Sequence, residues 1–353
     1  DRARRYLDYD RRLPVYFHYR HWRQHSFYID RYYGQARPVK WAPLGRAKLL
    51  HIAGHEEDSL KALEKDIICE PNDCAWAIYP QLVAERERRK YILEQAKAYV
   101  FSDRVKGILT GSEEISEQYA HIFGDEIRSK LIYSPSIYRM RPRKDAIDAI
   151  LSRNNTMAKG SPLRILCLSS NIETKATREV IKAWSTLGQV DAQLVMVVPK
   201  IDESIRQELK GMKNVCLVEK APLSVRERES LLRSCDVSIC CTWWDGGTNA
   251  IEALEYGHVV LCNSTHRDTA FEALGATIFE NNIKFYDMKY YGEKWWDLKE
   301  YMKFVYSKEC REERESFVDR LASKLLEIIN AQKVIVSLRL AVLDKWSPYT
   351  IYI

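Results

Sequence analysis

The sequence lacks the patterns that mark several classes of protein. No apolar run approaches the roughly 20 residues that a transmembrane helix requires, and the first ten residues, DRARRYLDYD, contain no apolar core of a signal peptide. The nine cysteines form no CxxC pair, and the eight histidines form no HExxH or similar ligand spacing. These absences argue against a membrane-spanning chain, a disulfide scaffold and a zinc site. Five cysteines fall within apolar, strand-like runs and are predicted to be small buried hydrophobes in a reducing compartment: Cys167, Cys216, Cys240, Cys241 and Cys262.

An excess of charge of one sign is absent from most of the chain. The net charge is +6, yet residues 1–47 alone hold eleven Arg and Lys and four Asp, so the remainder is close to neutral. Eleven aromatic residues are interleaved with these basic residues. This composition suits an anionic membrane surface or an acidic or sugar-containing ligand, or else a subdomain whose aromatics pack and whose arginines are solvated. Nucleic acid is not expected, because no nucleic-acid-binding motif accompanies the charge.

Strand-like and helix-like stretches alternate along the chain, which predicts an α/β fold. A length of 353 residues is typical of two domains. The polar stretch around Asn154 and Gly160 is the best candidate linker, so we predict an N-terminal domain over residues 1–158 and a C-terminal domain over residues 159–332. Residues 333–353 are predicted to form a terminal helix and tail that could cross back to the first domain.

The expected elements are short and regularly spaced. In the first domain we expect strands at residues 48–54, 66–70, 98–101, 107–111 and 131–133, and helices at residues 80–98 and 112–123. In the second domain we expect strands at residues 164–168, 193–198, 215–218, 237–241 and 258–262, and helices up to residue 187 and at residues 203–212, 225–233, 249–256, 309–330 and 332–345.

The most informative stretch is CDVSICCTWWDGGTNAIEALEYGHVVLCN, residues 235–263. It predicts a buried strand, a glycine-rich turn, a short helix from Asn249 that is closed by Gly257, and a second buried strand. Backbone N–H groups at such a turn and helix start form a site for a phosphate, with Glu252 facing the same crevice. The structural alternative is a capping box, in which Glu252 only reaches back to the backbone at Asn249.

The order of features in the second domain resembles that of GT-B glycosyltransferases, and most closely glycosyltransferase family 4, whose members are retaining enzymes that use nucleotide sugars. The likeness is carried by residues 164–280 and more weakly by residues 98–135. It implies two Rossmann-like β/α/β domains that face each other across a cleft. In the family, an Arg and a Lys after the first strand of the second domain hold the donor diphosphate. Here Lys175 matches the Lys, with a solvated surface lysine as the alternative, whereas Ser170 stands in place of the Arg.

The same resemblance supplies the other expected site residues. Glu252 matches the family's Glu that binds the nucleotide ribose. The family's first acid, eight residues earlier, is not matched, because Trp244 stands there and Asp245 follows it. Lys175 and Asp245 are therefore the catalytic candidates of this domain. The residues expected to bind the donor are Ser169, Ser170, Gly246, Gly247, Thr248, Asn249 and Glu252.

In the first domain, the resemblance implies a histidine near the transferred sugar. His55, after Gly54, is the catalytic candidate, His51 is the alternative, and a structural histidine is a third reading. Glu70 and Asp73 follow a predicted strand and are candidates for holding the acceptor.

The expected activity is transfer of a sugar from a nucleotide diphosphate sugar to a hydroxyl of a glycan or lipid-linked acceptor. Retention follows from the resemblance only, and no cofactor or metal is expected, because no acidic pair placed to hold an ion is identified. The alternatives are a nucleotide-sugar epimerase of the same architecture and a non-catalytic module that binds nucleotide sugar or glycan. We expect a cytoplasmic protein. Peripheral contact with the cytoplasmic face of an anionic membrane is the alternative.

Overall fold

The computed structural model describes residues 49–53, 66–70, 97–98, 100–103, 105–110, 116–117, 119–120, 123–133, 144–199, 201–220, 223–243, 248–263, 275–283 and 298–346. The chain divides into two compact units, residues 1–139 with residue 353, and residues 140–352. Within the described ranges, no helix is both long and apolar enough to cross a membrane.

The first unit contains a four-stranded parallel sheet in the order β1-β2-β3-β4. The strands are β1 (Leu49–Ala53), β2 (Asp66–Glu70), β3 (Val105–Thr110) and β4 (Leu131–Tyr133), and a 3-10 helix, η3 (Asp125–Lys130), precedes β4. Four of the five predicted strands are therefore confirmed. The strand predicted at residues 98–101 is wrong, because Ala98 and Val100 are helical and the Phe101 N–H donates to the Lys97 carbonyl at 3.0 Å. An apolar run this short does not distinguish a strand from the end of a buried helix.

The second unit contains a six-stranded parallel sheet in the order β10-β9-β8-β5-β6-β7. Its strands are β5 (Leu163–Leu168), β6 (Ala192–Val198), β7 (Val215–Glu219), β8 (Val237–Cys240), β9 (Val259–Asn263) and β10 (Thr277–Phe279). Counted within this unit, the order is 3-2-1-4-5-6, which is the strand order of Rossmann folds. Strands covered on both faces are nearly continuous in apolar residues, which is why five of these six strands were predictable.

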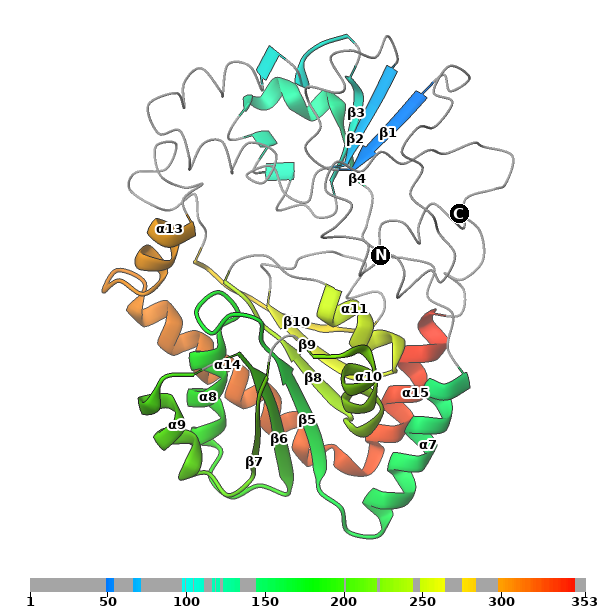
Figure 1. Ribbon diagram of the computed structural model, residues 1–353, viewed down its shortest axis with the longest axis vertical. Helices are drawn as coiled ribbons and strands as arrows, with labels where there is room; N and C mark the ends of the chain where they lie inside the picture. Colours follow the sequence, from blue (N-terminus) through cyan, green and yellow to red (C-terminus); the bar gives the residue numbers. More distant parts are fainter. Residues whose placement is uncertain are drawn as a thin grey trace. The chain divides into compact units, whose positions relative to one another are not determined.

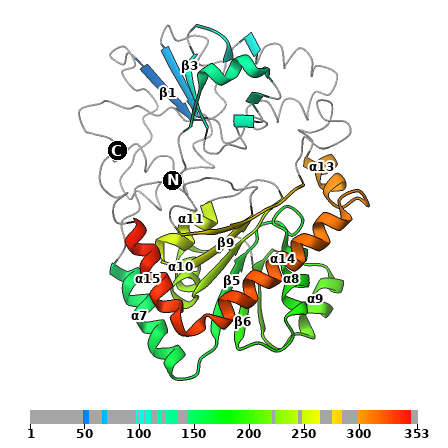
Figure 2. The same cartoon turned by 180° about the vertical axis from the view of Figure 1, so that it is seen from behind.

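Helices cover both faces of this sheet (Figures 1 and 2). One face carries α8 (Thr177–Thr186), α9 (Glu203–Lys210) and α14 (Arg311–Asn330). The other face carries α7 (Lys144–Ala158), α10 (Val225–Ser234), α11 (Thr248–Glu255) and α15 (Ile335–Trp346), with η6 (Gln332–Val334) just before α15. The helix α13 (Leu298–Val305) and the strand β10 are elements that the sequence did not predict.

The polar stretch that we expected to be a linker is mostly helical. The helix α7 continues through Asn154 and Asn155 to Ala158, and it packs against α10 and α15 within the second unit. Ala146 and Ile150 bury one side of α7, while Ser152, Asn154 and Asn155 face solvent. The polar composition therefore marks the exposed face of a helix rather than an irregular connection.

A buried carboxylate joins the helices of the second face to the sheet. Asp236, one residue before β8, is fully buried and accepts from the guanidinium of Arg339 on α15 at 2.7 Å and from that of Arg153 on α7 at 2.7 Å. The backbone N–H of Arg164 in β5 donates to the same carboxylate at 3.0 Å. Burial lowers the pKa of Arg339 to about 10, and the charge of Asp236 opposes that shift. A charge this deep is tolerated only when it is paired and hydrogen-bonded.

The end of α11 confirms the predicted role of Gly257. The Gly257 N–H donates to the Leu254 carbonyl at 2.8 Å and the His258 N–H donates to the Ala253 carbonyl at 3.0 Å, which together form a Schellman motif. Gly257 has φ of 63°, and a Cβ at this position would lie 2.7 Å from Cδ1 of Ile150. Both the backbone conformation and the packing of α7 therefore require glycine here.

We predict that Gly257→Ala destabilises the protein by about 2–5 kcal/mol, as the sum of left-handed strain and overpacking. Gly188→Ala is the matched control, because Gly188 follows α8 with φ of 66°, but a Cβ added there would meet nothing within 4 Å. It should cost only about 1–2 kcal/mol. Urea unfolding of both variants measures the difference, and equal losses would contradict the packing argument.

His258, next to Gly257, is held in its neutral form. Its Nε2 lies 2.6 Å from the Leu232 carbonyl, which can only accept, so Nε2 carries the proton and Nδ1 accepts from the Ser238 hydroxyl at 2.8 Å. Burial, reinforced by the nearby charge of Arg339, lowers the pKa of His258 from 6.5 to about 3. His258 is therefore a buried structural residue in the core of the second unit.

The depressed pKa of His258 makes stability depend on pH. Between about pH 6.5 and about pH 3, the unfolded chain binds a proton here that the folded chain does not. The free energy of unfolding should therefore fall as pH falls through this window, by up to ~1.4 kcal/mol per pH unit from this group. In His258→Gln this contribution is absent, so the stability gap between wild type and variant should narrow at lower pH in urea titrations. A gap that stays constant would show that His258 is not the source.

Candidate functional site

The middle of the six-stranded sheet is the point where its topology reverses. The strands β5 and β8 are neighbours, with Cys167 paired to Ile239, and the chain leaves them toward opposite edges of the sheet. In open α/β sheets, ligands bind outside the carboxyl ends of the strands at such a switch point. A ligand site is therefore expected at the segments that follow β5 and β8.

Side-chain and backbone hydrogen bonds hold the segment that follows β5 in place. The Ser169 hydroxyl donates to the Asn171 carbonyl at 3.0 Å, so the Thr177 hydroxyl, 2.7 Å away, donates to Ser169. The Ser169 N–H donates to Val197 in β6 at 2.8 Å. Ala176, the last residue before α8, has φ of 48°, a left-handed conformation that costs about 1–2 kcal/mol without glycine. Strain of this kind is often found at functional sites.

Hydrogen bonds join the segment after β5 to the segment after β8. The Thr174 carbonyl accepts from the Thr242 hydroxyl and from the Trp243 N–H, both at 2.8 Å. Asn263, at the end of β9, binds both the N–H and the carbonyl of Thr242, at 3.0 and 2.7 Å. Three neighbouring strand ends are thereby held at fixed positions.

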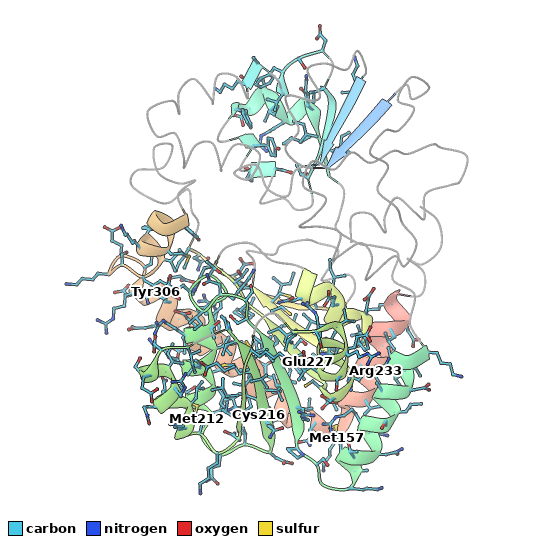
Figure 3. The ribbon with its side chains drawn as sticks, viewed as in Figure 1. Met157, Met212, Cys216, Glu227, Arg233 and Tyr306 are labelled. Carbon is cyan, nitrogen blue, oxygen red and sulfur yellow. The ribbon has the colours of Figure 1, made fainter. Side chains whose placement is uncertain are left out.

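Trp243 anchors the start of the glycine-rich segment in the core. Its indole N–H donates to the buried carboxylate of Glu179 on α8 at 3.3 Å, and its ring packs on Phe317 with centroids 4.7 Å apart. Burial raises the pKa of Glu179 above its ordinary value. Tyr306, labelled in Figure 3, reaches the same carboxylate at 3.4 Å and the Glu173 carbonyl at 3.2 Å. Trp243 is thus held in place by packing and hydrogen bonds together.

The first turns of α10 and α11 meet beside the end of β5. The side-chain N–H₂ of Asn249 donates to the carbonyl of Leu168, the last residue of β5, at 3.1 Å. The Asn249 oxygen accepts from Nη2 of Arg228 at 2.7 Å, and Nε of the same arginine donates to the Glu252 carboxylate. Glu252 and Asn249 therefore lie at the switch point.

The positions of Asn249 and Glu252 differ from those of a capping box. The helix α11 begins at Thr248, so Asn249 lies inside the helix and not at its N-cap. The Asn249 side chain is engaged with Leu168 and Arg228. The geometry is thus that of a cross-element network rather than of a capping box.

Thr248, another predicted site residue, is the first residue of α11. The predicted site residues not yet placed fall into three groups. Lys175 and Ser170 both lie in the segment that follows β5. Lys175, two residues before α8, is half-buried, and Ser170 is exposed. Glu70 is the last residue of β2, at the carboxyl end of the first sheet. The remaining candidates lie outside the described residues: His55, Asp73, Asp245, Gly246 and Gly247.

Two residues of this region were not predicted. Arg228 directly follows the Ser224–Glu227 capping box of α10, and Glu179 lies in the first turn of α8. Both positions are typical of solvated helix surfaces, so the sequence carried no signal for their partners. Within the described residues, no group of three or more acidic, His or Cys side chains is arranged to hold a metal ion.

Comparisons with known proteins agree with this architecture. No family model matches the sequence, and no curated protein matches it. The crystal structure of HepE from Anabaena in complex with UDP is similar, with a TM-score of 0.51 and 10% identity, over 86% of this chain and 75% of that chain. TarM gives a TM-score of 0.49 at 11% identity over 86% of this chain, and this chain covers only 52% of TarM. WaaG, a glycosyltransferase involved in lipopolysaccharide biosynthesis, gives 0.43 at 15% identity over 90% of this chain and 85% of that chain.

The strand order, the two parallel α/β units and the similarity to HepE identify the fold as GT-B, with two Rossmann-like units. The fold predicted from the sequence is therefore confirmed.

The anchoring role of Trp243 can be tested against a second buried indole. Trp184 is equally buried but donates to the neutral amide of Asn214 at 3.2 Å, whereas Trp243 donates to a carboxylate. Since charge-assisted hydrogen bonds are roughly twice as strong, Trp243→Phe should cost about 1–2 kcal/mol more than Trp184→Phe at about pH 8. Urea unfolding measures both losses. Equal losses would mean that the Glu179 contact contributes nothing beyond packing.

Proposed function

We propose that this chain is a glycosyltransferase that binds a nucleotide diphosphate sugar at the carboxyl ends of β5 and β8. The observation that carries this proposal is the placement of Glu252 and Asn249, on the helix that follows β8, beside the end of β5 at the switch point. A carboxylate at this position suits the hydroxyls of a ribose. HepE, which shares the fold, is seen in complex with UDP.

The phosphates would lie near the amino end of α11 and Lys175. When the bond between sugar and diphosphate breaks, negative charge develops on phosphate oxygens, and fixed N–H donors with a cation stabilise it. Lys175 is half-buried and close to the helix start of α8, where a cation is unfavourable unless an anion is near. This chemistry needs no metal, so we propose a metal-independent reaction.

The finer features of the proposal rest on the resemblance of the sequence to family 4. They are retention of the anomeric configuration, a glycan or lipid-linked acceptor hydroxyl, and catalytic roles for His55 and Asp245. Glu70 and Asp73 are the proposed acceptor-side residues. The basic, aromatic residues 1–47 suit an anionic glycan or the anionic cytoplasmic face of a membrane.

Incubation with a panel of nucleotide sugars, with and without a crude glycan acceptor, tests the activity. Acceptor-stimulated release of nucleoside diphosphate supports transfer. An isomerised sugar without release would identify an epimerase instead, and binding without either reaction would identify a non-catalytic module.

We predict that Glu252→Ala weakens binding of the nucleotide by about 1–3 kcal/mol, because a polar partner of the ribose is lost. Glu255→Ala, on the same helix but at its other end, is the control and should leave the affinity unchanged. Isothermal titration gives the affinities and thermal unfolding gives the stabilities. If Glu252→Ala lowers only the melting temperature, the carboxylate has a structural role and the proposed ribose contact is wrong.

A further inference from the structure

Two hydrogen bonds to α11 hold the Nε–Nη2 edge of the Arg228 guanidinium. Its Nε donates to Glu252 and its Nη2 donates to the Asn249 oxygen at 2.7 Å. These two acceptors are three residues apart on α11, so they lie on one face of that helix, whereas Arg228 belongs to α10. A lysine could not bridge two acceptors with this planar, two-pronged geometry. Arg228 therefore sets the orientation of the Glu252 side chain from a neighbouring element.

The same contacts tie Arg228 to the strand end. Asn249 binds the Leu168 carbonyl at the end of β5, so the network runs from β5 through α11 to α10. The side chains of Arg228 and Glu252 are 30% and 16% exposed, so the pair is neither a solvated surface contact nor a core contact. An ion pair of this kind can meet a ligand on its exposed side.

Charge explains why a carboxylate in this place needs a partner. An unpaired Glu252 would repel the diphosphate of a nucleotide, while its oxygens are suitable acceptors for ribose hydroxyls. The pairing with Arg228 offsets that charge, and a carboxylate has lone pairs enough to accept from a hydroxyl as well as from a guanidinium. Burial raises the pKa of the thiol of Cys240, the last residue of β8, and the charges of Arg228 and Lys175 oppose that shift, so the two cations lie near the same strand end.

We propose that Arg228 is a positioning residue for nucleotide recognition: it holds the Glu252 carboxylate in place for the 2′-hydroxyl of a nucleoside diphosphate and offsets its charge. This inference rests on the proposed function, because it assigns a residue to the same nucleotide site. Neither the sequence pattern nor the comparisons point to Arg228.

The experiment measures binding of UDP, GDP and ADP to the whole protein, and then of the 2′-deoxy form of whichever binds. In wild type, loss of the 2′-hydroxyl should weaken binding roughly tenfold, as expected for one hydrogen bond to a charged group. In Arg228→Met the ribonucleotide should bind more than tenfold more weakly, because the hydroxyl contact and the charge offset are both lost, and the difference between the ribo and deoxy forms should nearly vanish. Arg228→Lys keeps the charge but not the bridge, so it should restore part of the affinity and little of the discrimination.

Arg206→Met is the matched control. Arg206 on α9 is also 30% exposed and pairs with Glu219 at the end of β7, so its loss removes a comparable ion pair between two elements. It should leave both the affinity and the ribo-to-deoxy ratio unchanged. Thermal unfolding verifies that each variant is folded.

Each outcome separates the two claims. If wild type binds none of the three nucleotides, the proposed function fails and the role of Arg228 fails with it. If wild type binds but Arg228→Met keeps the full ribo-to-deoxy ratio, the positioning role is wrong while the proposed function stands. An equal loss for both forms would likewise overturn the positioning of Glu252, because it would indicate contact with the phosphates.

Discussion

The buried carboxylate of Asp236 is the constraint on which the second unit depends. Moving a charged group out of water costs several kcal/mol, and that cost is offset only if partners are in place. Asp236 has two guanidinium partners, Arg153 and Arg339, and the N–H of Arg164. These partners come from α7, α15 and β5, so the two helices cannot shift along the sheet without leaving a buried charge unpaired. Specific orientation is the more secure consequence of such a network, since buried ion pairs often contribute little net stability.

The strand β8 links this network to the candidate site. Asp236 directly precedes it, and Thr242 and Trp243 come shortly after its last residue, Cys240. Four residues of strand span roughly 13 Å. The amino end is fixed by two arginines and the carboxyl end by Thr174 and Asn263, so the segment that leads to α11 starts from a strand held at both ends. Sites built on elements supported in this way keep their geometry better than sites on loops alone.

The fold was predictable from the sequence where local patterns decide it. The apolar runs gave five strands of the second sheet, and Gly257 marked the end of α11 because left-handed backbone favours glycine. In the region of the candidate site, the sequence pattern singled out Glu252 and Asn249, which the structure places at the switch point. Arg228 and Glu179 carry no such signal, because their roles depend on partners 24 and 64 residues away in the sequence. The three-residue strand β10 was too short to predict, and the polar face of α7 resembled a linker because composition alone does not reveal which side of a helix is buried.

The two arginines that pair with Asp236 also determine how the chain can be divided. Arg153 lies before residue 159 and Arg339 lies after residue 332, so a fragment cut at those two points would retain the carboxylate and lose both of its cations. The smallest piece of this unit that keeps the pairing intact begins ahead of α7 and runs past the middle of α15. Helices at the two ends of this unit are therefore integral to its core and cannot be trimmed or exchanged as appendages.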